Sequence, residues 1–316
     1  MSTCSPAAMR VERPTAVTGR LMWRYAAPIA LLHALALLAC LPWLFSWTGV
    51  VLLVVGIYFY GGVGINLAYH RLLTHRSFAC PLWLERTFVL VAICCMEDAP
   101  GSWVAAHRLH HQDADQAPDP HSPRAGLFWS HIGWLLVENR QVRSASVYER
   151  YARDVLRDPF YMWLQRGVLT LWVYLAHAAL YFAGGLLAGW LTTGDAMQSL
   201  QFGLSVVVWG VILRTVCVWH ITWSVNSLSH WFGYRNYDTG EQSRNNWLVA
   251  LLSSGEGWHN NHHHDPASAS NQHRWWEFDF MYWFICALEA CGLASNVIRP
   301  RCRRQPHAAA AETVRT

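Results

Sequence analysis

Residues 48–75, TGVVLLVVGIYFYGGVGINLAYHRLLTH, run from an apolar segment directly into a pair of histidines. The apolar part, 48–69, has the length of about 20 residues that a helix needs to cross the hydrocarbon core of a bilayer. His70 and His75 follow at once, where the helix can break and let both rings turn inward. The stretch therefore predicts a membrane helix that ends in metal-binding side chains.

Three further segments have the same apolar character, namely 26–46, 167–191 and 200–222. The whole chain is 53% hydrophobic and only 14% charged, whereas a soluble domain is about 25% charged. This composition argues against a nucleic-acid partner and favours a lipid bilayer. The shorter apolar stretches 87–96, 127–137 and 278–292 are expected to form buried or interfacial helices.

Arginine predicts the orientation of these spans, since the chain has no lysine. Arginines precede the first span and recur through 70–165 and in the tail, but the links 46–48 and 192–199 have none. Positively charged loops stay in the cytoplasm, so both termini and the 70–165 region are expected there. A multi-pass protein of a bacterial inner membrane fits this pattern.

The expected fold class is therefore an all-α integral membrane protein. Four transmembrane helices form two hairpins, and a helical cytoplasmic cap built from 70–165 and 223–295 holds a site for two metals. We expect one membrane domain over 21–299, with disordered segments at 1–20 and 300–316.

Three groups stand out among the 17 histidines of the chain. They are the pair His70 and His75, the triplet His107, His110 and His111, and the triplet His259, His262 and His263. Within each triplet the spacing i, i+3, i+4 places the rings on one face of a helix. Because the topology puts all three groups on the same side of the membrane, we expect the rings to converge.

Eight imidazoles are too many for one structural zinc ion, which takes four ligands. Two metal ions suit this number better. Imidazole binds Zn, Cu, Fe or Ni, so the spacing alone leaves the element open.

The segments HRLLTHRSF, HRLHHQDADQAPDPHSP, FWSHIGWLL and GEGWHNNHH resemble the membrane-bound fatty acyl desaturases, of the stearoyl-CoA Δ9 type found in bacteria. The resemblance covers about residues 58–276. It implies two non-haem iron ions and O2 as co-substrate. It also implies that a saturated acyl chain receives a cis double bond, at Δ9, while two electrons are consumed. No catalytic side chain beyond the metal ligands is expected.

The resemblance adds two residues to the expected metal site. His230 matches a ninth histidine ligand, and Asn226 matches a residue that reaches a metal through water. Other histidines are not expected to bind metal, although His131 is a candidate for substrate contact; this group comprises His33, His121, His131, His177, His220 and His264. Four carboxylates are candidates for holding the outer ring nitrogens or, alternatively, for capping helices and turns: Asp115, Asp119, Glu256 and Asp265.

The acyl chain is expected to enter a hydrophobic tunnel walled by the second span. Tyr58 and Gly62 lie where the resembled family limits chain length, although a glycine there also suits close helix packing. Trp223 and Trp258 flank the metal motifs, as tunnel lining or as anchors at the membrane interface.

Arg108 and Arg124 match basic positions that contact the CoA phosphates in animal members, and arginine suits phosphate. Acyl-CoA is therefore the first expected substrate. Ala106 and Ala125 replace charged residues of those members, so a phospholipid-linked or carrier-protein-linked chain is the alternative.

We expect no fused haem domain within 1–20 or 300–316, so that a separate ferredoxin, rubredoxin or cytochrome b5-like protein supplies electrons. A hydroxylase with the same metal site is the nearest rival, because it differs only in inserting oxygen. A non-enzymatic metal transporter would need ligands along a pathway through the membrane, and a haem cytochrome would need histidine pairs in facing spans.

Overall fold

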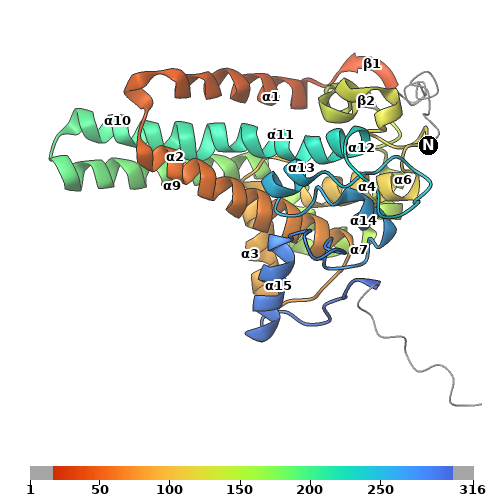
Figure 1. Cartoon of the computed structure of the whole chain (residues 1–316). Helices are drawn as coiled ribbons and strands as arrows, with labels where there is room; N and C mark the ends of the chain where they lie inside the picture. The colour runs from red at the N-terminus through yellow and green to blue at the C-terminus, as the bar shows by residue number, and fades with distance from the viewer. Residues whose placement is uncertain (1–16, 302–316) are drawn as a thin grey trace, which may run out of the picture.

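The computed structural model describes residues 17–301, which form a mostly helical molecule (Figure 1). Within this range, four helices are long and apolar enough to cross a membrane: Trp23–Cys40, Trp47–Thr74, Leu169–Thr193 and Ala196–Trp231. They confirm the four predicted spans. The second and fourth are longer than predicted, because both continue beyond their apolar parts into the histidine motifs.

In the first hairpin, two short 3-10 helices connect the two membrane helices. Its elements are α1 (Trp23–Ala36), η2 (Leu37–Cys40), η3 (Pro42–Leu44), α2 (Trp47–Gly56) and η4 (Ile57–Thr74). Ser46 caps α2 by accepting a 3.0 Å hydrogen bond from the Gly49 N–H, which satisfies one of the free donors at a helix start.

The second hairpin turns tightly at Gly194 and Asp195. Its elements are α9 (Leu169–Thr193), α10 (Ala196–Val207), η7 (Val208–Leu213), α11 (Arg214–Asn226) and α12 (Leu228–Trp231). Gly194 adopts φ +65°, a conformation that glycine reaches without strain. The Asp195 carboxylate then caps α10 by accepting from the Gln198 N–H at 2.8 Å.

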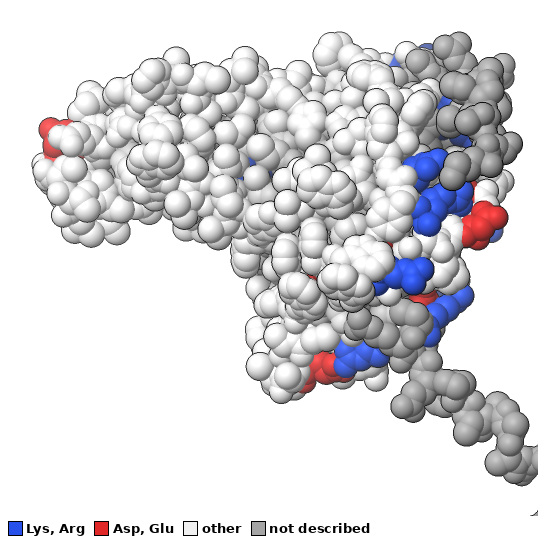
Figure 2. Space-filling model, in the orientation of Figure 1, with Lys and Arg blue, Asp and Glu red and all other residues white. Residues whose placement is uncertain are grey.

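The spans present apolar side chains outward, as a lipid-facing surface requires. Trp47, Leu180 and Leu191 are each about three-quarters exposed. Figure 2 shows this uncharged surface over the spans, with acidic atoms at the far tip where α9 and α10 join and arginines gathered at the opposite end.

The cap packs against the arginine-rich end of the spans. Its helices are α3 (Leu82–Ile93), α4 (Pro100–Gln112), η5 (Pro123–Ala125), η6 (Trp129–Gly133), α5 (Trp134–Leu136), α6 (Ala145–Tyr151), α7 (Arg153–Leu156), α8 (Pro159–Leu164), α13 (Trp247–Leu252), α14 (His259–His264) and α15 (Phe280–Ala290). The main core joins η4 to the cap through fully buried side chains such as Leu67, Leu73, Ile93 and Ile285. This core fixes the end of the second span relative to α4 and α14.

A small sheet includes residues 17–20, the end of the segment that was expected to be disordered. Strand β1 (Val17–Leu21) pairs antiparallel with β2 (Val137–Asn139), so the chain just before the first span is held against the cap. At the other end, the Arg301 N–H donates to Asp265 at 2.8 Å, which places the first residues of the expected tail. Residues 1–16 and 302–316 lie outside the described part.

Candidate metal centre

The first histidine pair is brought together by an unusual helix. η4 is a π-helix, in which the N–H of each residue bonds to the carbonyl five residues earlier. The last such bond joins the His75 N–H to the His70 carbonyl at 3.1 Å. Residues five apart lie on successive turns of a π-helix, so the two rings project to the same side, with centroids 4.7 Å apart. A break after His70 was expected. The structure has no break there, because the helix continues to Thr74 in the wider π form.

The nine predicted histidine ligands divide into two clusters. The five-histidine cluster comprises His70, His75, His107, His111 and His262, and the four-histidine cluster comprises His110, His230, His259 and His263. Within each cluster, one ring nitrogen per residue lies within 4.8 Å of all the others. The clusters adjoin, since the ring centroids of His111 and His263 are 4.7 Å apart.

Helical geometry explains this division. On α4, His107 and His111 are four residues apart and point to the five-histidine cluster, whereas His110 points to the other. On α14, His259 and His263 share the four-histidine cluster, and His262 joins the first. Positions i and i+4 lie about 40° apart around a helix, while i+3 lies on the opposite flank. Each triplet therefore serves both clusters.

The turn before α14 requires its two glycines. Gly255 has φ +122°, and a Cβ there would lie 2.8 Å from the Asp279 carboxylate. A Cβ on Gly257 would lie 2.1 Å from the Ala250 backbone nitrogen. The Gly-Glu-Gly sequence thus lets the chain turn tightly and present Glu256 and His259 from adjacent positions.

The spacing of the ring nitrogens fits bound metal ions. Successive Nε2 atoms in the five-histidine cluster are 3.1, 2.9 and 3.0 Å apart, along His70, His262, His111 and His107. The four-histidine cluster gives 3.3, 3.1 and 3.1 Å. With metal–nitrogen bonds of about 2.1 Å, ligands at right angles lie about 3.0 Å apart and tetrahedral ligands about 3.4 Å apart. The clusters thus suit near-right-angled coordination better than tetrahedral zinc.

The protonation of the rings also fits metal binding. The His75 Nε2 is buried without a hydrogen-bond partner among the described residues, which is costly unless a ligand satisfies it. Burial, reinforced by the neighbouring rings, lowers the pKa of His75, His107, His111, His259 and His262 far below the usual value. Neutral imidazole is the form that donates a lone pair to a metal.

Carboxylates face the outer nitrogens of four rings. The Nδ1 atoms contact carboxylates as follows: His70 to Glu256 at 2.9 Å, His110 to Asp119 at 3.0 Å, His230 to Asp115 at 3.3 Å and His263 to Glu241 at 3.7 Å. The three contacts within hydrogen-bond distance would keep the proton on Nδ1 and leave Nε2 free for metal. Three of the four carboxylates proposed from the sequence take this place. The fourth, Asp265, contacts Arg301 instead, and Glu241 was missed.

Arg71 anchors this outer layer beneath the five-histidine cluster. Its guanidinium contacts Glu256 at 2.7 Å and Asp279 at 2.9 Å, and all three side chains are buried. Burial tends to raise the pKa of Glu256, but Arg71 and His70 outweigh it and hold that pKa at about 2. Glu256 therefore stays ionised. It connects His70, in the first histidine group, to the turn that leads into the third group.

Arg108, which was predicted to contact the substrate headgroup, is bonded within the protein. All its N–H groups are used within the protein, by the carbonyls of Leu73, Thr74 and Tyr151 and by the Asp154 carboxylate. A guanidinium has five donors, so none remains for a phosphate. Arg108 instead ties the end of η4 to α4 and α6, whereas Arg124, on η5, is only half-buried.

The other predicted substrate residues lie around the spans. Tyr58 and Gly62 are on η4, and a Cβ on Gly62 would lie 3.0 Å from the Met281 Cε. Trp223 is buried on α11, and the buried Trp258 precedes α14 and donates to the Phe278 carbonyl at 2.5 Å. The half-buried Asn226 ends α11 one turn before His230.

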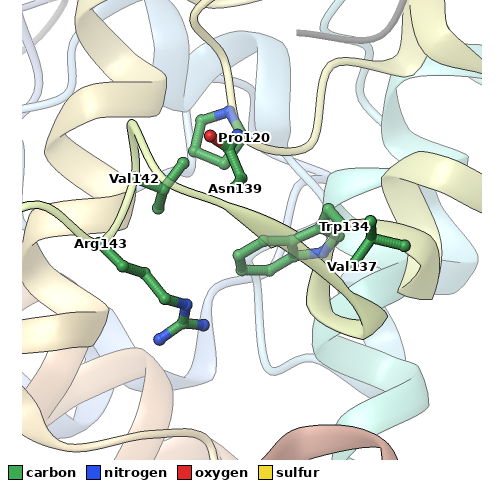
Figure 3. A pocket seen from close by; sticks show the side chains of 6 residues that line it. All are labelled: Pro120, Trp134, Val137, Asn139, Val142 and Arg143. Atoms are coloured by element: carbon green, nitrogen blue, oxygen red, sulfur yellow. The ribbon is translucent and has the colours of Figure 1, made fainter. Parts of the chain in front are cut away.

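Of the six histidines set aside from the sequence, His121 lies nearest to the clusters. Its ring centroid is 4.3 Å from that of His110, and both rings face Asp119. Trp134 covers its other side at 5.2 Å and lines a small pocket with Arg143 and four further residues (Figure 3). His264 stacks on Tyr237, and His177 bonds to the Tyr60 hydroxyl at 2.9 Å. The rings of His33 and His131 each lie 3.0 Å from a nitrogen of His220, apart from the metal clusters.

Four membrane spans and two adjoining histidine clusters define a multi-pass membrane protein equipped to bind metal ions. Comparison with known proteins gives the particular family. The chain belongs to the fatty acid desaturase family, which matches residues 41–285. It is therefore an oxidoreductase that introduces double bonds into fatty acyl chains.

Individual relatives support the same assignment. The chain is 42% identical to an sn-1 stearoyl-lipid 9-desaturase of Anabaena variabilis, over 84% of this chain and 90% of the relative. It is 40% identical to an sn-2 palmitoyl-lipid 9-desaturase of a Nostoc species, over 88% and 91%. It is also 40% identical to an acyl-CoA 5-desaturase of Anemone leveillei, over 85% and 77%.

Proposed function

We propose that this protein places a cis double bond at Δ9 of a saturated acyl chain carried on a membrane glycerolipid, using two iron ions, O2 and two electrons. The observation that carries the proposal is the pair of adjoining histidine clusters at the end of the spans. Iron bound there would supply the oxidant that removes hydrogen from an unactivated methylene, which no side chain can do.

The protein's own residues would hold and orient the metals. The five- and four-histidine clusters provide the ligands, with Asn226 as a further, water-linked contact to the metal of the His230 side. The carboxylates behind His70, His110 and His230 would keep the Nε2 atoms of those three rings unprotonated. The cap covers both clusters, in which five histidines are buried and four half-buried, and it would limit the access of bulk water to the reacting carbons.

The position of the double bond would follow from the distance between the bound headgroup and the metals. η4 runs from the membrane to His70, so Tyr58 and Gly62 are suited to line the acyl tunnel and limit its depth. Trp223, buried between Trp219 and His131, is suited to the wall near the metals, with Trp258 on the third histidine group. Several relatives are named as 9-desaturases, which supports Δ9.

The names of two relatives, an sn-1 stearoyl-lipid and an sn-2 palmitoyl-lipid 9-desaturase, favour a lipid-linked chain over the acyl-CoA expected from the sequence. Arg108 has no free donor for a CoA phosphate, which leaves Arg124 alone of the predicted pair. An open groove beside β1 and β2 is lined by Arg20, Arg24 and Arg140, together with Trp23. Arginine and tryptophan at a membrane surface suit an anionic lipid headgroup.

The electron donor and the orientation complete the proposal. The arginine-rich end would face the cytoplasm, in a bacterial inner membrane, as positive charge in loops favours. A separate ferredoxin, rubredoxin or cytochrome b5-like protein with an acidic surface would dock there.

The test uses the purified, iron-loaded protein in nanodiscs with a reducing partner. One sample receives 13C-stearoyl-CoA, and the other contains lipid with a 13C-stearoyl chain at a known glycerol position. The proposal predicts Δ9 product from the lipid without passage through free CoA ester. Product from the CoA ester alone would establish the other carrier, and a mass gain of one oxygen would establish a hydroxylase.

A further inference from the structure

Two loops of the cap, residues 232–246 and 265–279, pack against each other beside α14 and are here called the paired loops. The Glu277 carboxylate joins them by accepting from the Asn236 side-chain amide at 2.8 Å. The same carboxylate accepts from the side-chain amide of Asn261, on α14, at 2.8 Å. The paired loops are therefore fixed to the helix that carries the third histidine group.

The paired loops also reach the four-histidine cluster. Glu241, in the first loop, faces His263 with an Oε1–Nδ1 distance of 3.7 Å. His264, the next residue of α14, stacks on Tyr237 of the same loop, with ring centroids 3.7 Å apart. The Tyr237 hydroxyl in turn lies 3.0 Å from the Nδ1 of His273, in the second loop. A molecule bound to the outer face of the paired loops would thus lie close to the metal ligands.

Folding makes the surface of the paired loops basic, although their sequence is acidic. They contain five acidic residues and three arginines. Four of the acidic side chains are buried, namely Glu241, Asp265, Glu277 and Asp279. Within the two loops, all of which the structure describes, the charged side chains that reach the surface are Arg235, Arg244, Arg274 and a single carboxylate, Asp238. The outer face is therefore positive and attracts a negatively charged partner.

Trp275 projects into solvent next to Arg274. It is 86% exposed, the largest fraction of any large hydrophobic side chain among residues 17–301. Its turn is held in place, because the buried Glu277 carboxylate accepts from the Arg274 N–H at 2.7 Å and the Glu277 N–H donates to the Arg274 carbonyl at 3.2 Å. Hot spots of protein interfaces are enriched in tryptophan and arginine. A pair presented on a fixed turn also loses little entropy when a partner binds.

A second arginine-bearing face of the cap, on α6, α7 and α8, has a different charge pattern. Its arginines are paired with carboxylates of the same surface: Arg153 with Glu149 at 3.0 Å, Arg76 with Asp154 at 3.2 Å and Arg86 with Asp158 at 3.3 Å. Neighbouring charges of opposite sign cancel at a distance, so this face attracts an acidic partner less strongly. The groove beside β1 and β2 is already proposed for the lipid headgroup.

We propose that the paired loops are the docking surface for the electron donor, a small acidic protein that carries one electron. The inference rests on the proposed function. Desaturation follows R–CH2–CH2–R′ + O2 + 2 e⁻ + 2 H⁺ → R–CH=CH–R′ + 2 H2O, and each of two reduced carriers gives up one electron. Both electrons come from outside the chain, so a carrier must bind close to the metal ligands. The arginines speed its encounter, and Trp275 packs against it once bound.

The first test measures binding without turnover. The iron-loaded protein in nanodiscs, without acyl substrate, is titrated with the oxidised forms of a plant-type ferredoxin, a rubredoxin and a cytochrome b5, and the tightest binder is used further. We expect Arg274→Gln to raise its Kd about tenfold and to weaken the salt dependence. Trp275→Ala should raise the Kd about tenfold with an unchanged salt dependence. Arg153→Gln and Trp163→Ala are matched controls, since both side chains are exposed on the second face, and should keep the Kd.

Oxidative footprinting shows what covers Trp275. We expect strong labelling of Trp275 in the protein embedded in nanodiscs, and protection when the carrier is added. Trp163 should be labelled equally in both samples. If Trp275 is already protected in the nanodisc before the carrier is added, the turn contacts the bilayer and the docking surface is wrong.

Steady-state desaturation supplies a third readout. We expect Arg274→Gln and Trp275→Ala to raise the KM for the reduced carrier about tenfold. The KM for the acyl lipid and the rate at saturating carrier should stay unchanged, because neither side chain belongs to the metal site.

Reduction by a photoreduced flavin, which needs no docking surface, separates this inference from the proposed function. If the intact protein forms no double bond even then, the proposed function fails, whereas binding and footprinting still test the docking surface. If none of the three carriers binds the intact protein, or if both variants bind and use the carrier as it does, the docking surface is wrong. Variants that slow equally with flavin and with the carrier would show a merely structural role, and would also overturn it.

Discussion

Replacing Glu256 with Gln should weaken metal binding in the five-histidine cluster selectively. The carboxylate accepts from Arg71 and Asn271 and contacts the His70 Nδ1 at 2.9 Å. All three neighbours are donors, so the amide NH2 of Gln must face at least one of them. The change thus breaks a hydrogen bond and leaves Arg71 with one carboxylate, Asp279.

The magnitude follows from two effects. Loss of a residue that orients a metal ligand typically costs about 10- to 100-fold in metal affinity, and we expect this loss in the cluster that contains His70. Removing one partner of a buried ion pair costs about 3–5 kcal/mol. Since Asp279 still pairs with Arg71, we expect a loss of about 3 kcal/mol of folding stability, at the lower end of that range.

The assay is stepwise metal release from the purified protein by a chelator, followed by mass spectrometry of the metal content. We expect one of the two metals in Glu256→Gln to leave at about 10- to 100-fold lower chelator concentration, and the other to stay. Asp265→Asn is the matched control, because that buried carboxylate contacts Arg301. Unchanged release from Glu256→Gln, or equal loss from both variants, would refute the reasoning.

Further predictions concern the substrate, the protonation of the site and the identity of the metal. Arg108→Ala should lower the melting temperature and cost about 3 kcal/mol of folding stability, because charged hydrogen bonds are removed. The KM for the acyl substrate should stay unchanged. A raised KM with an unchanged melting temperature would restore a substrate role. Gly62→Trp should shorten the longest chain that is desaturated, as judged by gas chromatography of the products, and equal chain lengths would contradict this. In the metal-free protein, the pKa values of the buried histidines are depressed, so the unfolded state binds more protons than the folded state below pH 6.5. The free energy of unfolding should therefore be fully present above that pH and fall by about 1 kcal/mol per ring at pH 5.5. A melting temperature that is flat or rises toward pH 5.5 argues against neutral, buried rings. Exchange of iron for zinc should preserve the melting temperature but abolish desaturation, and an active zinc protein would exclude the redox role.

The sequence was sufficient to predict the four spans and the convergence of eight histidines, and the family resemblance added His230. Both rest on strong local signals, namely apolar length for the spans and helical spacing for the triplets. The path of the second span after His70 was not predictable, because a π-helix differs from an α-helix only in its backbone bonding. The pairing of His70 with His75 therefore appeared to require a break.

Contacts between distant segments explain the other differences. Glu241 lies 18 residues before the third histidine group, and only the fold brings it to His263. Arg108 matched a substrate-binding position, but it is occupied by carbonyls from the end of η4 and from Tyr151 on α6. The contacts of His220 with His33 and His131 join three segments whose adjacency no spacing rule indicates. Strand β1 was missed because its partner β2 lies more than 100 residues away.

The most direct test is expression in cells that lack unsaturated fatty acids, with location of any double bond by mass spectrometry of the lipids. The account predicts cis Δ9 monounsaturated chains from the intact protein and none from a variant such as His262→Ala, which removes a ligand of the five-histidine cluster. Lipids that gain oxygen, or that stay fully saturated although the purified protein holds two iron ions per chain, would contradict it.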